Sequence, residues 1–130
     1  MTSLLLDTHT LIWAINEPDR LGTVARSLIL DTGNDLFVSA GSAWELHTKH
    51  RIGKLPDAGS WLASLENHIM RLGARVLDIT WQHAKLAGDL DWSHRDPFDR
   101  MLAAQALTES LTLVSTDRVF DDLSPLTVAW

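Results

Sequence analysis

Short apolar runs, each with an acidic residue close by, recur along this 130-residue chain and limit the folds it can adopt. One run ends directly in Asp7, a second leads to Glu45, and a third leads to Asp117, while Asp99 stands between two further apolar stretches. Continuous apolar runs of this kind are typical of strands buried on both faces of a parallel sheet. Because ligands bind beyond the carboxyl ends of the strands in such sheets, these acids could meet at one edge.

Strand and helix patterns alternate along the whole chain. Strands are expected at residues 3–6, 36–39, 75–79, 111–114 and 126–129, and helices at 8–16, 23–30, 42–51, 60–72, 81–90 and 96–109. The polar residues expected to cap helices are Thr8 or Thr10, Ser42, Thr80 and Asp96. Strands that alternate with helices predict a three-layer α/β/α fold around a mostly parallel central sheet. The length predicts a single domain spanning residues 1–130.

Composition excludes several classes of protein. The chain has no cysteine, so disulfides, thiolate metal sites and cysteine nucleophiles are ruled out, in keeping with a cytoplasmic location. No apolar stretch is long enough to span a membrane, and we expect no membrane association. A net charge of −6 argues against a passive nucleic-acid binder, because phosphate binding needs lysine and arginine. An enzyme that meets phosphate through a metal ion remains compatible with that charge.

Carboxylates gathered at one sheet edge repel one another unless a cation holds them, and oxygen ligands favour Mg²⁺ or Mn²⁺. In the segment 96–99, Asp96 suits the N-cap of a helix, Pro97 its first position and Asp99 its third. A side chain at the third position leans back toward the helix start, which would direct Asp99 to the sheet edge. The alternative is that these acids, like Asp7 and Asp117, only cap helices or turns.

Basic residues also cluster close to these acids in the sequence. The basic residues follow Glu45, flank Asp96 and Asp99, or follow Asp117; they are Lys49, Arg51, Lys54, Arg95, Arg100 and Arg118. They could contact the phosphates of a nucleic acid, or they could form salt bridges on solvated helix faces. The six tryptophans are expected in the core or at an interface rather than as stacking platforms for bases. If one of them stacks on a base, Trp92 is the best candidate, because it lies in a polar segment.

Four segments in order resemble the acidic motifs of PIN-domain ribonucleases, and more closely those of the VapC toxins of bacterial type II toxin–antitoxin pairs. The segments are Leu4-Leu5-Leu6-Asp7-Thr8-His9, Ser42-Ala43-Trp44-Glu45-Leu46 with Lys49 and Gly53-Lys54-Leu55, Asp96-Pro97-Phe98-Asp99-Arg100-Met101-Leu102-Ala103-Ala104-Gln105-Ala106, and Ser115-Thr116-Asp117. The resemblance implies that Asp7, Glu45, Asp99 and Asp117 are the catalytic and metal-binding residues. Supporting roles are expected for Thr8, Asp96, Ser115 and Thr116, whose polar groups could orient the carboxylates.

The resemblance further implies an endoribonuclease that depends on Mg²⁺, or alternatively Mn²⁺, and cleaves structured RNA such as tRNA or rRNA. A metal-activated water would attack the phosphodiester and leave a 5′-phosphate and a 3′-hydroxyl. The family also implies a homodimer and a small cognate antitoxin, carrying a DNA-binding domain, that covers the acidic groove. Two alternatives stay open at this stage: a non-catalytic module of the same fold that docks a basic peptide, and a housekeeping nuclease of RNA maturation.

Overall fold

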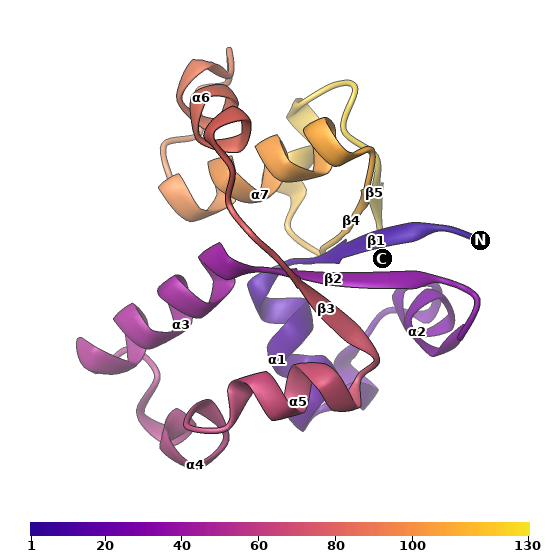
Figure 1. Ribbon diagram of the computed structural model, residues 1–130, viewed down its shortest axis with the longest axis vertical. Coiled ribbons are helices and arrows are strands. Elements are labelled where there is room, and N and C mark those ends of the chain that lie inside the picture. Colours follow the sequence, from indigo (N-terminus) through magenta and orange to yellow (C-terminus); the bar gives the residue numbers. More distant parts are fainter.

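The central sheet of the computed structural model, which describes residues 1–130 apart from the side chain of Pro56, has five strands that all run parallel (Figure 1). Their order across the sheet is β3-β2-β1-β4-β5. The strands are β1 (Ser3–Leu6), β2 (Asp35–Ser39), β3 (Ala74–Leu77), β4 (Thr112–Val114) and β5 (Val128–Ala129). The central position of β1 explains why Leu4, Leu5 and Leu6 are completely buried.

Alternation along β1 divides the apolar residues between two cores. Leu4 and Leu6 face a core completed by α1 (Thr8–Asn16), α2 (Thr23–Leu30), α3 (Ala40–Arg51), α4 (Gly59–Leu62) and α5 (Leu65–Arg71). Leu5 faces the other core, which is completed by α7 (Pro97–Glu109) and η3 (Arg118–Asp122), with α6 (Trp81–Asp89) packed on α7. Figure 1 shows α6 and α7 on one side of the sheet and α1, α2, α4 and α5 on the other. The expected three-layer α/β/α fold is thus confirmed.

The short 3₁₀ segments η1 (Pro18–Arg20) and η2 (Pro56–Ala58) each begin at a proline. Among the described residues, no helix has both the length and the apolar character to cross a bilayer.

Several helix boundaries differ from the sequence expectation. Asp7, rather than Thr8 or Thr10, caps α1, and Ser39, rather than Ser42, caps α3 by accepting a hydrogen bond from the Gly41 backbone N–H. The single helix expected over 60–72 is two helices, α4 and α5. The caps expected at Thr80 and Asp96 are confirmed.

Parallel pairing places the carboxyl ends of all strands at one edge of the sheet. The acidic segments leave from that edge: Asp7 follows β1, α3 with Glu45 follows β2, and Asp117 lies just beyond β4. Since α3 also packs against α7, the start of α7 with Asp99 is brought toward the same edge.

Candidate active site

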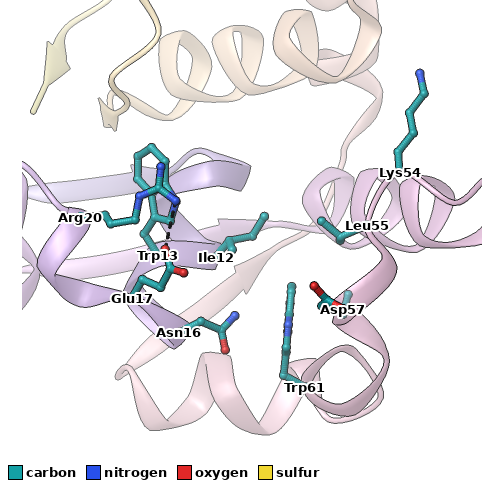
Figure 2. Close-up of a pocket in the computed structure, with 10 residues that line it drawn as sticks. Ile12, Trp13, Asn16, Glu17, Arg20, Lys54, Leu55, Asp57 and Trp61 are labelled. Atoms are coloured by element: carbon teal, nitrogen blue, oxygen red, sulfur yellow. Dashed lines mark hydrogen bonds and ion pairs between the residues drawn. The ribbon is translucent and has the colours of Figure 1, made fainter.

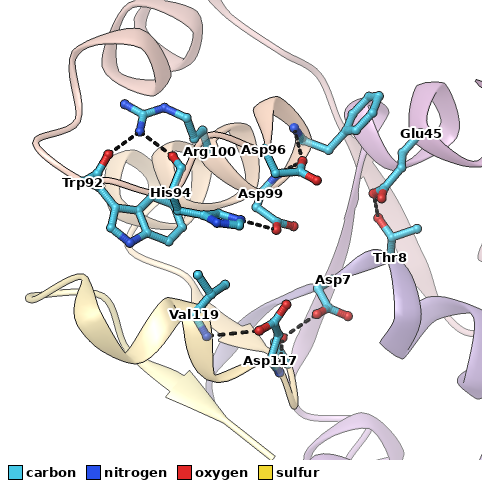
Figure 3. Close-up of polar contacts among 12 residues, drawn as sticks. Asp7, Thr8, Glu45, Trp92, His94, Asp96, Asp99, Arg100, Asp117 and Val119 are labelled. Carbon is cyan, nitrogen blue, oxygen red and sulfur yellow. Dashed lines mark hydrogen bonds and ion pairs between the residues drawn. The ribbon is translucent and has the colours of Figure 1, made fainter.

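A pocket of about 170 Å³ at this edge gathers the acidic residues from four distant segments of the chain (Figure 3). Its lining residues are Asp7, Thr8, His9, Glu45, Lys49, Asp96, Asp99 and Asp117. All four acids that the sequence analysis singled out as ligands therefore share one pocket, together with the supporting residue Asp96.

Asp7 is almost completely buried, and both of its carboxylate oxygens accept hydrogen bonds. Oδ1 accepts the backbone N–H of Thr10 at 2.8 Å, which caps α1, and Oδ2 accepts the hydroxyl of Ser115. The Ser115 oxygen in turn accepts the backbone N–H of Asp117 at 3.0 Å. Ser115 therefore ties the Asp7 carboxylate to the loop that carries Asp117.

Glu45 lies inside the pocket wall rather than on the outer face of its helix. The Thr8 hydroxyl donates to Glu45 Oε1 at 2.6 Å, and Lys49 Nζ lies 2.5 Å from Oε2. A hydroxyl has one proton to donate, so the 3.0 Å contact between the Thr8 and Ser42 hydroxyls has Ser42 as its donor. A buried carboxylate with this set of partners is held in one orientation.

The start of α7 contributes two further carboxylates. Asp96 Oδ1 caps the helix by accepting the backbone N–H groups of Phe98 and Asp99, at 2.8 and 3.1 Å. Asp99 Oδ2 lies 2.7 Å from His94 Nε2. Burial raises the pKa of the Asp99 carboxyl above its ordinary value, and the nearby charges of Asp96 and Glu45 raise it further, while the contact with His94 opposes the shift.

Sequence reasoning missed His94 as part of this site, and it assigned no role there to His9, while Lys49 was expected only as a basic residue near Glu45. His94 reaches Asp99 from the loop before α7, and nothing in its spacing indicates that contact. His9 and Lys49 line the pocket itself. Thr116, expected in a supporting role, is exposed and lines the neighbouring hollow beside Asp117 instead.

Arg100 and Trp92, which the sequence suggested as contacts for RNA, instead make contacts within the protein. The Arg100 guanidinium donates to backbone carbonyls of the α6–α7 connection, among them those of Leu90, Trp92 and His94, each at 2.8 Å. Trp92 is half-buried, with its ring 5.8 Å from that of Phe120 and 5.0 Å from that of His94. Both residues therefore shape the loop that presents His94 (Figure 3).

The pocket offers carboxylate oxygens, which are the ligands that hard cations prefer. These carboxylates lie close together, since the charges of Asp96 and Glu45 raise the pKa of Asp99, and a bound cation would offset their mutual repulsion. Among the described residues, no three histidines or acids converge tightly enough to hold an ion by direct contact alone. Mg²⁺ does not need such a cage, because it keeps several water ligands and is held by one or two carboxylates together with substrate phosphates. The residues therefore fit Mg²⁺ better than a fully coordinated metal such as structural zinc.

Comparisons with known proteins agree with this architecture. Residues 4–125 match the family model described as PIN domain. The chain is 35% identical over 122 residues to "Ribonuclease VapC22" of Mycobacterium tuberculosis, covering 91% of this chain and 89% of that protein.

Two solved structures share the fold. VapBC from Salmonella typhimurium, crystallised bound to DNA, gives a TM-score of 0.72 at 24% identity and covers 99% of this chain and 98% of its own. VapBC2 from Rickettsia felis, bound to a promoter DNA fragment, also gives 0.72, at 18% identity and 98% coverage of both chains. The chain belongs to the PIN domain family, and within it to the VapC ribonucleases.

Proposed function

We propose that this chain is a metal-dependent endoribonuclease toxin that cleaves structured RNA, such as tRNA or rRNA, and is neutralised by a cognate antitoxin. The observation that carries the proposal is the convergence of Asp7, Glu45, Asp99 and Asp117 on one pocket at the carboxyl edge of the sheet. The relative named a ribonuclease supports the activity. We take residues 1–130 to act as one nuclease domain in the cytoplasm, where its RNA substrates are found.

Asp7 and Asp99 are the residues we assign to hold Mg²⁺, with Mn²⁺ as the substitute, and Asp117 is assigned either to bind the ion or to orient its water. When bound, the ion lowers the pKa of a coordinated water and stabilises charge on the attacked phosphate. Glu45 is the residue best placed to orient that water, because Thr8 and Lys49 fix its carboxylate at the pocket wall. Ser115 hydrogen-bonds both to the Asp7 carboxylate and to the backbone of Asp117, and this link holds the two acids at the same pocket.

Asp7→Asn tests the catalytic proposal with little risk to the fold. Asparagine caps a helix about as well as aspartate, so α1 should keep its N-terminal hydrogen bond. Losing the charge should lower Mg²⁺-dependent cleavage of total RNA by at least about a hundredfold, the usual effect of removing a transition-state-stabilising group.

The matched control is Asp89→Asn, which removes the same charge from the exposed end of α6. Thermal melting should show that both variants stay folded. Cleavage by the Asp7→Asn variant at the wild-type rate would refute the assignment. Growth arrest on expression, relieved by the antitoxin, separates a toxin from a housekeeping RNA-maturation enzyme.

The partner we propose is a small antitoxin with a DNA-binding domain, and the active form of the toxin is proposed to be a homodimer. The structural neighbours are VapBC complexes bound to DNA, which supports the pairing. A basic side chain from the antitoxin would enter the acidic pocket, since guanidinium groups pair strongly with carboxylates.

If that is correct, Mg²⁺ and the antitoxin compete for the same carboxylates. Added Mg²⁺ should weaken antitoxin binding, and the Asp7→Asn/Asp99→Asn double variant should bind the antitoxin at least about tenfold less tightly, equivalent to about 1.4 kcal/mol. Calorimetric titration of toxin with antitoxin measures both effects. Equal affinity for wild type and double variant, with no effect of Mg²⁺, would place inhibition outside the pocket.

A further inference from the structure

A second hollow, of about 240 Å³, opens directly beside the acidic pocket and is lined by lysines in place of carboxylates. The two share Thr8, His9 and Lys49 as lining residues. The remaining residues that line the second hollow are Ile12, Leu46, Lys54 and Leu55. Two lysines thus line it, and none of its described lining residues is acidic.

The turn that follows α3 places Lys54 at the same hollow as Lys49, which lies in the last turn of the helix. Gly53 adopts a φ of +83°, a conformation that favours glycine, and the chain reverses there. As a result the backbone N–H of Lys54 donates to the carbonyl of Lys49 at 2.9 Å, and that of Gly53 donates to His50 at 3.1 Å. The turn brings the backbone of Lys54 back against that of Lys49.

A simpler explanation for these cations is that they only offset the negative end of the α3 dipole. The dipole would favour a positive charge on any side of the last turn, so it does not explain why the lysines lie at the hollow. Arg51, in the same turn as Lys49, does not line the hollow, whereas Lys49 and Lys54 do. Lys49 is paired with Glu45, but no carboxylate of the described residues lies within ion-pair distance of the Lys54 ammonium. Lys54 is exposed, and Figure 2 shows its side chain extended away from the ribbon.

We propose that the hollow formed by Lys49 and Lys54 binds a backbone phosphate of the RNA strand next to the phosphate that is cleaved. The inference rests on the proposed nuclease function, which puts the scissile phosphate in the acidic pocket. A neighbouring phosphate would be repelled by the five carboxylates there, and Lys54, which has no carboxylate partner among the described residues, supplies the positive charge that it needs. The hollow shares Ile12, Lys54 and Leu55 with a larger neighbouring cleft (Figure 2). That cleft is lined by two tryptophans that could stack on a base and also by charged side chains: Trp13, Trp61, Glu17, Arg20 and Asp57.

Salt dependence of RNA binding tests the phosphate contact without relying on cleavage. All variants are made in the cleavage-deficient Asp7→Asn background, and the probe is a short fluorescein-labelled oligouridylate followed by anisotropy in Mg²⁺ over a range of KCl concentrations. Lys54→Met should weaken binding several-fold, and it should reduce the slope of log affinity against log salt by about 0.7, the value for one single-strand phosphate contact. Lys54→Arg, which keeps the charge, should restore the slope.

Lys85→Met is the matched control, because it removes the same charge from an exposed position on α6. Its slope should equal that of the parent protein. An unchanged slope in Lys54→Met, or equal losses in Lys54→Met and Lys85→Met, would overturn the phosphate subsite. So would a Lys54→Met variant that binds RNA normally and loses affinity only for the antitoxin, since the hollow would then receive an acidic protein segment.

These results are distinguishable from failure of the proposed function. If the wild-type chain cleaves RNA, the Asp7→Asn variant does not, and the Lys54→Met slope is unchanged, then the subsite is wrong and the nuclease assignment stands. If the wild-type chain cleaves no RNA in Mg²⁺, the nuclease assignment itself is wrong.

Discussion

Asp99 is a carboxyl group whose surroundings favour its neutral form. Its pKa is raised above the ordinary value of 3.8 by burial and by the charges of Asp96 and Glu45. The folded state therefore holds this proton more tightly than the unfolded chain does. The resulting contribution to stability is fully present below pH 3.8 and is lost as the pH rises through the raised pKa. Near neutral pH the metal-free protein thus bears the cost of an ionised Asp99, and a bound cation would relieve that cost.

Replacing Asp99 with asparagine should therefore stabilise the metal-free protein at neutral pH. Asparagine keeps an oxygen for the contact with His94 but carries no charge. In EDTA at pH 7 we expect the Tm of the variant to lie above that of the wild type, because the variant has no carboxyl group to ionise in this buried position. The gain should shrink as the pH is lowered from 7 through the raised pKa of Asp99, because the wild-type carboxyl is itself protonated below it.

Differential scanning calorimetry of wild type and variant across this pH range measures the effect, with Asp89→Asn on the surface of α6 as the control for removing a charge. Mg²⁺ should raise the Tm of wild type more than that of Asp99→Asn. A variant that melts below wild type at pH 7 without metal would show that the ionised carboxylate is stabilising, contrary to the shift described here.

At the scale of helices and strands, sequence reasoning succeeded where local chemistry decides the structure. Thr80 and Asp96 were identified as caps because a cap bonds to backbone groups only two or three residues away. It was wrong about Ser42, because two serines stand three residues apart and the choice between them depends on a distant contact. Ser39 caps α3, and Ser42 instead meets the hydroxyl of Thr8 on α1.

The candidate site could be predicted only in part, where the sheet topology decides which residues meet. The acids that follow the strands could be predicted to meet, since a parallel sheet brings its carboxyl ends together. The contact between His94 and Asp99 could not, because it depends on the path of the α6–α7 connection. Arg100 holds that path by donating to backbone carbonyls along the connection, including those of Leu90 and His94. The sequence shows only an arginine beside an acid.

At the scale of the whole molecule, Trp130, which directly follows β5, packs against residues of the N-terminal helical segments. Its ring lies 5.6 Å from that of Trp13 on α1, in an edge-on contact. It also packs directly on Gly22, at the start of α2, where an added Cβ would lie 2.5 Å from Trp130 Cδ1. That distance is too short for two carbon atoms, so a side chain at position 22 would force α2 and Trp130 apart.

Gly22→Ala should therefore destabilise the protein for a purely steric reason. The φ of Gly22 is −62°, which alanine adopts without strain, so backbone conformation plays no part. The expected loss is about 1–3 kcal/mol, as for overpacking of other close contacts. Gly88→Ala in α6 is the matched control, because an added Cβ there meets nothing within 4 Å and should stabilise the helix by up to about 1 kcal/mol. Urea denaturation gives both values.

Combining Gly22→Ala with Trp130→Leu should lower the free energy of unfolding by less than the sum of the two single changes, since removing the indole removes the clash. Strict additivity would mean that Gly22 and Trp130 do not press on each other in solution.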